Sequence, residues 1–357
     1  MKLLDSTVGR LAAFLIPSPL RRNHTFENIS LLIIRSGGIG DAVLLASTIN
    51  SLKNNNPNIC ITILAEQRNA GVFSLIPGVD AVYRYDHPCE FFQALRGRYN
   101  VVIDTEQWYR LSAVVARLVS APIKIGFDTN ERRRMFTHGI RYDLGIYETG
   151  NFSALLKPLG VDCQLDVGIV TLSLPPQSVS KADQLLQPHC SDLFVVIYPG
   201  ASIAEKRWGG ERFSAVAKQL ESGGYRVVVV GGKEDRPAGN MIAGSAGLNL
   251  AGMTTLAETA AVIARSSLVI SGDSGVLHIA VGLNIPTVSL FGPSSEAKWA
   301  PQGEKHIVLN RHLPCSPCAK FGTTPPCSIN ASCIRDITSD EVMAAAERLL
   351  SQPPDGK

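Results

Sequence analysis

Short runs of apolar residues recur along the whole chain, and most are followed by a turn of small or polar residues and then by helical spacing. A run of about four to eight apolar residues is typical of a buried strand, and apolar positions at helical spacing indicate a helix. Their alternation predicts parallel, doubly wound sheets. The predicted strands are 31–35, 60–64, 81–85, 101–104 and 123–127 in the first half, and 194–198, 225–230, 248–251, 268–271 and 287–291 in the second.

A break in this alternation divides the chain into two predicted domains. Residues 174–192 are polar and begin with two prolines, which predicts a linker near 175–190. A chain of 357 residues is long enough to bury two cores. We therefore expect an α/β protein with two Rossmann-like, doubly wound domains, 31–180 and 190–337, facing a central cleft. Residues 1–30 form an N-terminal extension, and residues 338–357 form a final helix and tail.

Composition and charge exclude several classes of protein. Hydrophobic residues make up 45% of the chain and charged residues 18%, which is typical of a globular protein and not of a disordered one. The net charge of +3 gives no indication of nucleic-acid binding. No apolar run approaches the roughly 20 residues of a membrane-spanning helix. Arg132, Arg133 and Arg134 form the densest basic run, which predicts a solvated face or a contact for an anionic ligand or acidic surface.

The first residues carry an amphipathic pattern. Leu4, Val8, Leu11 and Leu15 recur at helical spacing with basic residues around them. This segment is predicted either to pack on the protein as an ordinary helix or to lie on an anionic bilayer surface. A signal peptide fits poorly, because charged residues interrupt the apolar stretch and prolines cut it short. We therefore expect a cytoplasmic protein, with peripheral contact to the inner face of the inner membrane as one alternative.

Four of the eight cysteines, Cys315, Cys318, Cys327 and Cys333, gather near the C-terminus. The first pair has the spacing of half a zinc site, but the spacing of the second pair is irregular. The pattern leaves open a structural metal, loop thiols or a redox-sensitive pair. Cys60 lies in an apolar strand pattern and is predicted to be a buried thiol. Because no export signal is present, a reducing compartment argues against a disulfide scaffold.

The turn after the first strand carries candidate chemistry in the first domain. Gly38, Gly40 and Asp41 lie between this strand and a helix predicted over 42–52, at the sheet edge where parallel folds bind ligands. Asp41 is either a helix cap or a functional carboxylate. The turn lacks the third glycine of a dinucleotide fingerprint, and no P-loop motif is present. Further polar side chains follow another strand end and are expected to line the same site: Asp104, Glu106, Gln107 and Trp108.

Two strand ends of the second domain combine small residues with polar side chains. Ser202 and Lys206 supply a hydroxyl and a compact cation, which are the donor types that a diphosphate needs. Glu234 and Asp235 follow the next strand, and either of them can accept hydrogen bonds from ribose. Because the ends of parallel strands meet at one edge of a sheet, these turns together predict a nucleotide-sized site.

Residues 267–293 predict a strand, a turn, a helix and a second strand. The unpaired backbone N–H groups at the helix start near Gly275, together with the Ser274 hydroxyl, suit a phosphate. His278 follows about one helical turn later and can face the same ligand. In the alternative, structural interpretation Asp273 caps the helix, Gly275 relieves a tight turn and His278 is an interior histidine.

These motifs resemble glycosyltransferase family 9, the family of the ADP-heptose:lipopolysaccharide heptosyltransferases. The resemblance runs from about Leu31 to Ile337 and rests on GGIGDAVLLAS, PGAS with the following KRW, GGKED, LAGMTTLAE and GDSGVLHIAVGLNIPTVSLFGP. It implies a GT-B fold, with the acceptor bound by the first domain and the nucleotide sugar by the second. It also implies transfer with inversion, without a metal or another cofactor. The extension before Leu31 is longer than the minimal start of the family.

The resemblance further implies roles for individual residues. Asp41 would be the general base that removes the proton of the acceptor hydroxyl, and Lys206 would stabilise the charge of the departing diphosphate. The implied donor contacts are Ser202, Glu234 or Asp235, Met253, Asp273, Ser274, Gly275 and His278. The expected acceptor contacts are Gly38, Gly40, Asp104, Gln107 and Arg132.

The sequence therefore predicts an inverting, metal-independent glycosyltransferase. Its expected partners are a nucleotide-sugar donor, with ADP-heptose as the first candidate, and a lipid-linked saccharide acceptor such as the lipopolysaccharide core. The alternatives are a nucleotide-sugar epimerase of the same architecture and a non-catalytic nucleotide-sugar-binding protein. Asp41 and Lys206 together argue against the binding protein, because binding alone needs no base.

Overall fold

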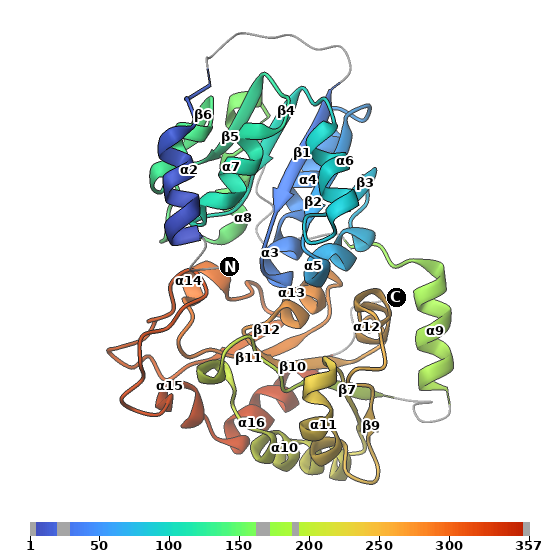
Figure 1. Ribbon diagram of the computed structural model, residues 1–357. Helices are drawn as coiled ribbons and strands as arrows, with labels where there is room; N and C mark the ends of the chain where they lie inside the picture. The colour runs from blue at the N-terminus through green and yellow to red at the C-terminus, as the bar shows by residue number, and fades with distance from the viewer. Residues whose placement is uncertain (1–4, 20–28, 162–171, 188–192, 353–357) are drawn as a thin grey trace. The chain divides into compact units, whose positions relative to one another are not determined.

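Two parallel sheets form the framework of the chain in a computed structural model, which describes residues 5–19, 29–161, 172–187 and 193–352 (Figure 1). Internal contacts divide the chain into two units, Met1–Leu165 and Asp166–Lys357. Each unit contains one six-stranded sheet with helices packed against it. The predicted pair of Rossmann-like domains is therefore confirmed.

The first unit is built on a sheet with the strand order β3-β2-β1-β4-β5-β6, in which all neighbours are parallel. Its strands are β1 (Ser30–Arg35), β2 (Cys60–Ala65), β3 (Ala81–Arg84), β4 (Val101–Asp104), β5 (Ile123–Phe127) and β6 (His138–Ile140). Its helices are η1 (Asp5–Gly9), α2 (Arg10–Leu15), α3 (Ile39–Leu44), α4 (Ala46–Asn55), α5 (Gln67–Ala70), η2 (Gly71–Leu75), α6 (Pro88–Arg96), α7 (Arg110–Leu118), η3 (Glu131–Met135), α8 (Glu148–Ala154) and η4 (Lys157–Leu159).

The second unit repeats this arrangement with the strand order β12-β11-β10-β7-β8-β9, again with parallel neighbours throughout. Its strands are β7 (Phe194–Tyr198), β8 (Arg226–Val229), β9 (Leu248–Asn249), β10 (Leu268–Gly272), β11 (Thr287–Leu290) and β12 (His306–Leu309). Its helices are α9 (Pro176–Leu186), η5 (Ala204–Lys206), α10 (Gly210–Ser222), η6 (Lys233–Asp235), α11 (Arg236–Ala243), α12 (Leu256–Ile263), α13 (Gly275–Gly282), α14 (Glu296–Trp299), α15 (Ser332–Arg335) and α16 (Ser339–Leu350).

The order of the strands fixes where each unit can bind a ligand. In both sheets the chain starts at a central strand, moves outward on one side and then returns to the other side. The loops after two neighbouring strands consequently diverge, at β1 and β4 in the first unit and at β7 and β10 in the second. Ligands of such sheets bind at this switch point, beside the carboxyl ends of the strands.

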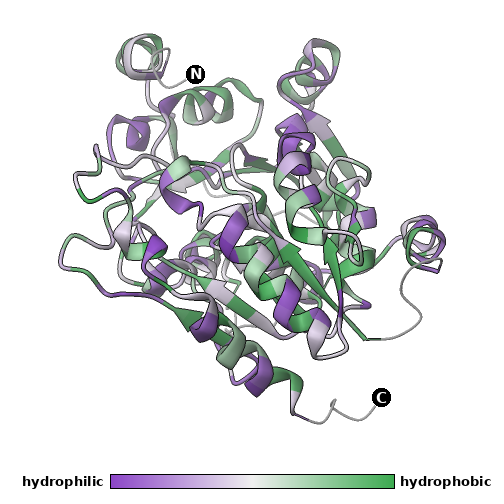
Figure 2. Ribbon diagram, turned by 90° about the horizontal axis from the view of Figure 1, so that it is seen from below, coloured by the Kyte–Doolittle hydropathy of each residue, from purple (hydrophilic) through white to green (hydrophobic). Residues whose placement is uncertain are grey.

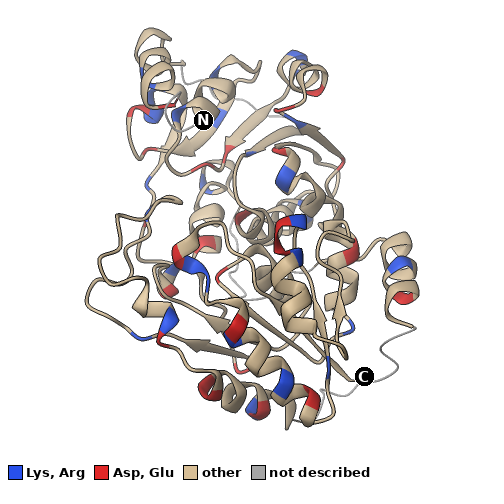
Figure 3. Ribbon diagram, turned by 60° about the horizontal axis from the view of Figure 1, so that its bottom comes forward, with Lys and Arg blue, Asp and Glu red and all other residues tan. Residues whose placement is uncertain are grey.

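The strands are apolar along their length because both faces of each sheet are covered. Residues 31–34 of β1 and 195–197 of β7 are almost completely buried. A parallel sheet that is covered by helices on both faces needs such continuous apolar strands. The strands are mostly green in the hydropathy view (Figure 2), whereas the charged residues are carried mainly by helices and loops (Figure 3).

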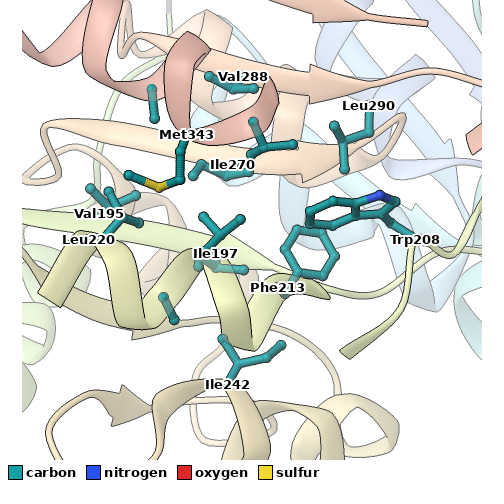
Figure 4. Packing of buried hydrophobic residues seen from close by; sticks show 14 of the residues in the cluster. Val195, Ile197, Trp208, Phe213, Leu220, Ile242, Ile270, Val288, Leu290 and Met343 are labelled. Atoms are coloured by element: carbon teal, nitrogen blue, oxygen red, sulfur yellow. The ribbon is translucent and has the colours of Figure 1, made fainter. Parts of the chain in front are cut away.

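The core of the second unit anchors the loop that follows β7. Trp208 is 2% exposed and packs edge-on against Phe213 of α10, with 4.8 Å between the ring centroids (Figure 4). Its Nε1 donates a hydrogen bond to the carbonyl of Ile337 at 2.8 Å. A buried tryptophan with its polar atom paired is a rigid anchor. Lys206 lies two residues before this anchor, so the position of its backbone is fixed by the core.

The ten predicted strands are confirmed, with ends that differ by no more than two residues. The apolar pattern does not predict β6 or β12, which are outer strands of their sheets. Every residue of β12 is only partly buried, so this strand lacks the continuously buried character of the central ones. The helix predicted over 42–52 is divided into α3 and α4. The predicted final helix is α16, with a capping box between Thr338 and Glu341.

The linker expected near 175–190 is replaced, in its described part, by helix α9. Its first helical residue is Pro176, and a proline there is tolerated because the first N–H groups of a helix have no intrahelical acceptor. The helix packs against α12 of the second unit, and the contact division falls earlier, between Leu165 and Asp166. Residues 188–190 of the expected linker lie outside the described residues.

Two smaller expectations concern Cys60 and the N-terminal helix. Cys60 is exposed, so the prediction of a buried thiol is wrong: it is the first residue of β2, and burial begins at the next residue. The helix predicted from Leu4, Val8, Leu11 and Leu15 is present as η1 and α2, although Leu4 lies outside the described residues. In the described ranges, no helix combines the length and apolar character needed to cross a bilayer.

Candidate active site

The first unit places Asp41 at its switch point, in the turn between β1 and α3. Asp41 lies in the first turn of α3, where its side chain is 18% exposed. Gly38 is the N-cap residue of this helix, and a Cβ atom there would lie 2.8 Å from Asp41 Oδ2. A side chain at position 38 would therefore displace the carboxylate. Gly40 lies in the same helical turn as Asp41.

Gln107 and Arg35 orient the Asp41 carboxylate. Gln107, in the loop after β4, donates from Nε2 to Asp41 Oδ1 at 3.1 Å and to Glu148 Oε1 at 2.7 Å. Arg35, the last residue of β1, places Nη2 3.6 Å from Asp41 Oδ2. Glu148 of α8 is completely buried and also accepts a hydrogen bond from the Tyr142 hydroxyl at 2.8 Å. The carboxylate is thus held from two sides while part of it stays open to solvent.

Arg35 is a fixed buried cation among these carboxylates. It is 2% exposed, donates from Nη1 to the Thr105 carbonyl at 2.9 Å and lies 3.5 Å from Glu106 Oε2. Burial alone would lower the pKa of Arg35, but the surrounding carboxylates outweigh it and the pKa lies above its usual value. Burial raises the pKa of Glu106, against the effect of Arg35 and Arg132. Among these acids Asp41 is the one that reaches solvent, since the Glu106 side chain is 5% exposed.

Asp104 and Arg132 form a buried ion pair, which corrects their predicted role as acceptor contacts. Both side chains are completely inaccessible, and Arg132 Nη2 lies 2.7 Å from Asp104 Oδ2. Arg132 also donates to the Glu106 carbonyl, and the Ser112 hydroxyl donates to Asp104 Oδ2 at 2.9 Å. Arg133, by contrast, is exposed. Only part of the arginine run is therefore a solvated face, and the buried part holds the loop after β4.

The second unit places Lys206 and Asp273 together at its switch point. Lys206 belongs to the short helix η5 after β7, and Asp273 directly follows β10. Lys206 Nζ lies 2.6 Å from Asp273 Oδ2, with the side chains 18% and 10% exposed. Burial works to raise the pKa of Asp273, but Lys206 and His278 outweigh it and hold the pKa below its usual value. The pair therefore fixes a cation beside the start of α13.

Helix α13 begins with the turn predicted to suit a phosphate. Ser274 is the N-cap residue, and its hydroxyl accepts from the Leu277 amide at 3.2 Å and lies 2.8 Å from the Ser271 hydroxyl. Gly275 opens the helix and is partly exposed. His278 is 2% exposed and its Nε2 lies 4.0 Å from Asp273 Oδ1. The capping role of Ser274 and a phosphate site at the backbone amides are compatible, because they use different groups.

The turn after β8 separates the roles of Glu234 and Asp235. Asp235 is 7% exposed, its Oδ2 accepts from the Gly232 amide at 2.9 Å, and burial raises its pKa. Cβ atoms added to Gly200 or Gly231 would each lie 2.7 Å from Asp235 Oδ2, so its carboxylate is enclosed between two turns. Glu234 is exposed. Of the two acids left open by the sequence, Glu234 is the one available to a ligand.

Ser202 and Met253 are accessible at the same edge of the second sheet. Ser202 is exposed in the loop after β7, and Met253 is 49% exposed in the loop after β9. The Gly252 amide donates to the Gly231 carbonyl at 2.9 Å, so the loop after β9 lies against the turn after β8. The structure thus gathers the predicted donor residues around the loops that follow four neighbouring strands.

Sequence reasoning missed Arg35 and Glu148 as parts of the first unit's cluster. Arg35 carried a signal, since it is a charged residue at the end of an otherwise apolar strand. Glu148 carried none, because it is brought to Gln107 by α8 from 41 positions further along the chain.

The four clustered cysteines line a single pocket of about 80 Å³ in the second unit. Cys333 is buried, Cys318 is partly buried, and Cys315 and Cys327 are exposed. Burial raises the pKa of the Cys318 and Cys333 thiols, and the neighbouring cysteines add to this effect. In the part of the chain that the structure describes, no three His, Cys, Asp or Glu side chains are arranged to hold a metal ion.

Comparison with known proteins identifies close similarity in sequence. The model of the family described as glycosyltransferase family 9 (heptosyltransferase) matches residues 89–328. Lipopolysaccharide heptosyltransferase 3 of Escherichia coli is 31% identical over 346 residues, covering 89% of this chain and 98% of that protein. Neither rival prediction, an epimerase or a non-catalytic binding protein, is favoured by these matches.

Solved structures support the fold. A family 9 glycosyl transferase from Veillonella parvula has a TM-score of 0.78 at 22% identity, with 92% of this chain and 99% of that one covered. ADP-heptose heptosyltransferase II of Escherichia coli has a TM-score of 0.75 at 23% identity, with 90% and 98% covered. The predicted GT-B fold is confirmed.

Proposed function

Because this chain belongs to glycosyltransferase family 9 and is a glycosyltransferase, we propose that it transfers heptose from ADP-heptose to a lipid-linked saccharide of the lipopolysaccharide-core type. The names of its relatives supply the sugar and the acceptor class. The observation that carries the proposal is Asp41, an oriented and partly exposed carboxylate at the switch point of the first sheet.

Asp41 is the proposed general base. In this mechanism it takes the proton of the acceptor hydroxyl while that oxygen bonds to the anomeric carbon and the bond to the diphosphate breaks. Attack from the side opposite the diphosphate gives inversion. Gln107 and Arg35 support this role, because they fix the carboxylate before the substrate arrives. Asp104 and Glu148 cannot act as the base instead of Asp41, because both are completely buried and cannot reach the acceptor hydroxyl.

Lys206 and the start of α13 are proposed to receive the diphosphate. Negative charge develops on the leaving group as the sugar bond breaks, and a fixed cation beside free backbone amides stabilises that charge. Asp273 supports this arrangement by holding Lys206 beside the helix start. No step of this proposal calls for a metal or another cofactor.

The exposed side chains of the second unit are proposed to bind the nucleoside. Glu234 accepts hydrogen bonds from the ribose hydroxyls, Ser202 donates to a phosphate oxygen, and Met253 lies against the base. Their support is their common place at the carboxyl edge of the sheet and their exposure. His278 is proposed to act on the donor indirectly, by setting the position of Asp273.

The place of action that we propose is the cytoplasmic face of the membrane that carries the acceptor. A lipid-linked saccharide stays at the bilayer, so the enzyme must meet it there. The amphipathic N-terminal segment predicted from the sequence supports such a peripheral contact.

The experiment is a transfer assay with the purified full chain, ADP-heptose and a lipid-linked core acceptor, read as ADP release and as product mass. Asp41→Asn should lower kcat by about 10²–10⁴-fold, because a general base typically contributes that factor. The Kd of ADP should stay unchanged. Asp340→Asn, at an exposed position in the first turn of α16, is the matched control. Transfer by Asp41→Asn at the kcat of the wild type would remove Asp41 from the mechanism.

A further inference from the structure

The N-terminal segment carries its large apolar side chains on the outside. Of the thirteen large hydrophobic residues that are exposed in the described chain, four lie between positions 8 and 15. Val8, Leu11, Phe14 and Leu15 are 51%, 61%, 69% and 68% exposed, and Leu118 at the end of α7 is 61% exposed. We call these five residues the N-terminal apolar patch. Such a concentration of exposed apolar side chains marks an interaction surface.

The inner side of the same segment is fixed to the first unit through small and polar residues. Asp5 is 4% exposed, and its Oδ1 accepts from the backbone amides of Arg110 and Leu111 at 2.6 and 2.8 Å, at the start of α7. A Cβ atom on Gly9 would lie 3.3 Å from Arg110 Cβ, and Ala13 is completely buried. The segment is therefore docked on α7 and η3 (Figure 1), and its outward face is set by the fold.

The end of α7 extends the patch. Arg117 Nε donates to the Pro17 carbonyl at 2.9 Å, so the end of α7 lies beside the end of the docked segment. Leu118, the residue after Arg117, is exposed at this end of α7. The patch thus combines side chains from two parts of the chain that are about 100 residues apart.

Arginines border the patch. The Arg10 side chain is 69% exposed, and Arg134 is also exposed; the neighbouring Arg133 is exposed too, with its stem beside Gly139 of β6. The Arg134 guanidinium lies over the Phe14 ring, 5.1 Å from its centroid, so the basic and apolar groups are in direct contact. Two acids lie in this region: Glu131 lies 3.2 Å from Arg10 and is also paired with Arg110, and Asp5 lies 3.5 Å from Arg110. Arg10, Arg110 and Arg134 outnumber Glu131 and Asp5, which leaves an excess of positive charge at the border.

We propose that the N-terminal apolar patch and its arginines dock the protein on an anionic phospholipid surface. Leucine, phenylalanine and valine side chains enter the boundary between head groups and acyl chains, while the arginines bind lipid phosphates. A second copy of the chain is a poorer occupant. A two-fold interface would bring the same patch of both copies together and place the arginines of one against those of the other.

The purpose of this contact rests on the proposed function, because a lipid-linked acceptor explains why the enzyme needs a bilayer. The contact itself can be tested without donor or acceptor. Failure of vesicle binding would leave transfer to a water-soluble acceptor intact, and failure of transfer would leave vesicle binding intact. The two proposals can therefore be judged separately.

The experiment is vesicle flotation of the full chain with phosphatidylethanolamine vesicles that contain phosphatidylglycerol. Phosphatidylcholine vesicles provide the neutral comparison. The protein should float with the anionic vesicles and lose binding as salt is raised, since screening weakens the arginine contacts. Leu11→Ser with Phe14→Ser should weaken binding by at least about tenfold, because these side chains lose their transfer from water. Arg133→Ser with Arg134→Ser should weaken it by about fivefold per arginine.

Leu144→Ser, which changes an exposed leucine of the same unit outside the patch, is the matched control and should bind like the wild type. Thermal melts and circular dichroism verify that each variant is folded. Equal vesicle binding by the patch variants, or no binding by the wild type, would overturn the proposal. A wild-type dimer in solution that Leu11→Ser with Phe14→Ser converts to a monomer would assign the patch to a second copy instead.

Discussion

Replacing Arg132 by methionine should destabilise the first unit strongly. The substitution keeps most of the side-chain volume but leaves Asp104 as a buried carboxylate without its cation. Removing one member of a buried ion pair typically costs about 3–5 kcal/mol. The first unit contains about 165 residues, and in a domain of that size 1 kcal/mol corresponds to about 2–4 °C in Tm. The product of the two ranges is a fall in Tm of roughly 6–20 °C.

The measurement is a calorimetric scan of the full chain, because two units can give separate transitions and the affected one must be identified. Arg133→Met is the matched control, since Arg133 is the exposed neighbour and its replacement should change stability by no more than about 0.5 kcal/mol. Asp104→Asn added to Arg132→Met should recover part of the loss, because it removes the unpaired buried charge. Such non-additivity is expected for two residues in contact.

An unchanged Tm of Arg132→Met would have a different meaning. If Arg132→Met has the same Tm as the wild type and instead raises the KM for the acceptor, then Arg132 contacts the acceptor, as the sequence predicts. That outcome would refute the assignment of this residue to the buried pair.

Two further predictions concern the second unit. Glu234→Ala should raise the KM for the donor about tenfold without lowering Tm. Asp235→Ala should lower Tm, because it leaves the Gly232 amide without its acceptor. The reverse pattern would mean that Asp235 binds the donor and Glu234 stabilises the fold. Burial, aided by Lys305, lowers the pKa of His306 from 6.5 to about 4. Between these values the unfolded chain binds a proton that the folded chain does not, so stability should fall as pH falls from about 6.5 towards 4. The urea midpoint of His306→Gln should depend less on pH across this range than the midpoint of the wild type. An equal pH dependence in both proteins would contradict the lowered pKa of His306.

The strands were predictable because a parallel sheet that is covered on both faces requires uninterrupted apolar runs, and β1 and β7 provide them. The turns that hold Asp41, Lys206 and Asp273 were predictable for a related reason, since polar residues directly after such strands must lie at one edge. Partial burial does not decide whether a strand is predictable, because the edge strands β3 and β12 are equally partly buried and only β3 was predicted.

Burial of individual polar side chains was the part that the sequence could not supply. Arg132 and Arg133 are the same residue type in adjacent positions, yet one is completely inaccessible and the other is exposed. Asp235 and Glu234 differ in the same way. The distinction depends on which direction a short 3₁₀ turn gives each side chain, and local sequence does not determine it. Glu148 and Gln107 meet only through tertiary structure.

The position of α16 has a consequence for the synthesis of the protein. Val342 and Ala346 of this helix are completely buried in the core that also contains Ile197 and Ile270 from the central strands. Figure 4 shows Met343 of the same helix in this cluster. The second unit therefore cannot complete its core until residues 339–350 have left the ribosome. The strands described in the first unit all end by residue 140, so this unit can fold while the rest is still being translated. A nascent chain stalled before α16 would consequently carry a folded first unit joined to an incomplete second one, and its unpaired apolar surface would be a target for chaperones.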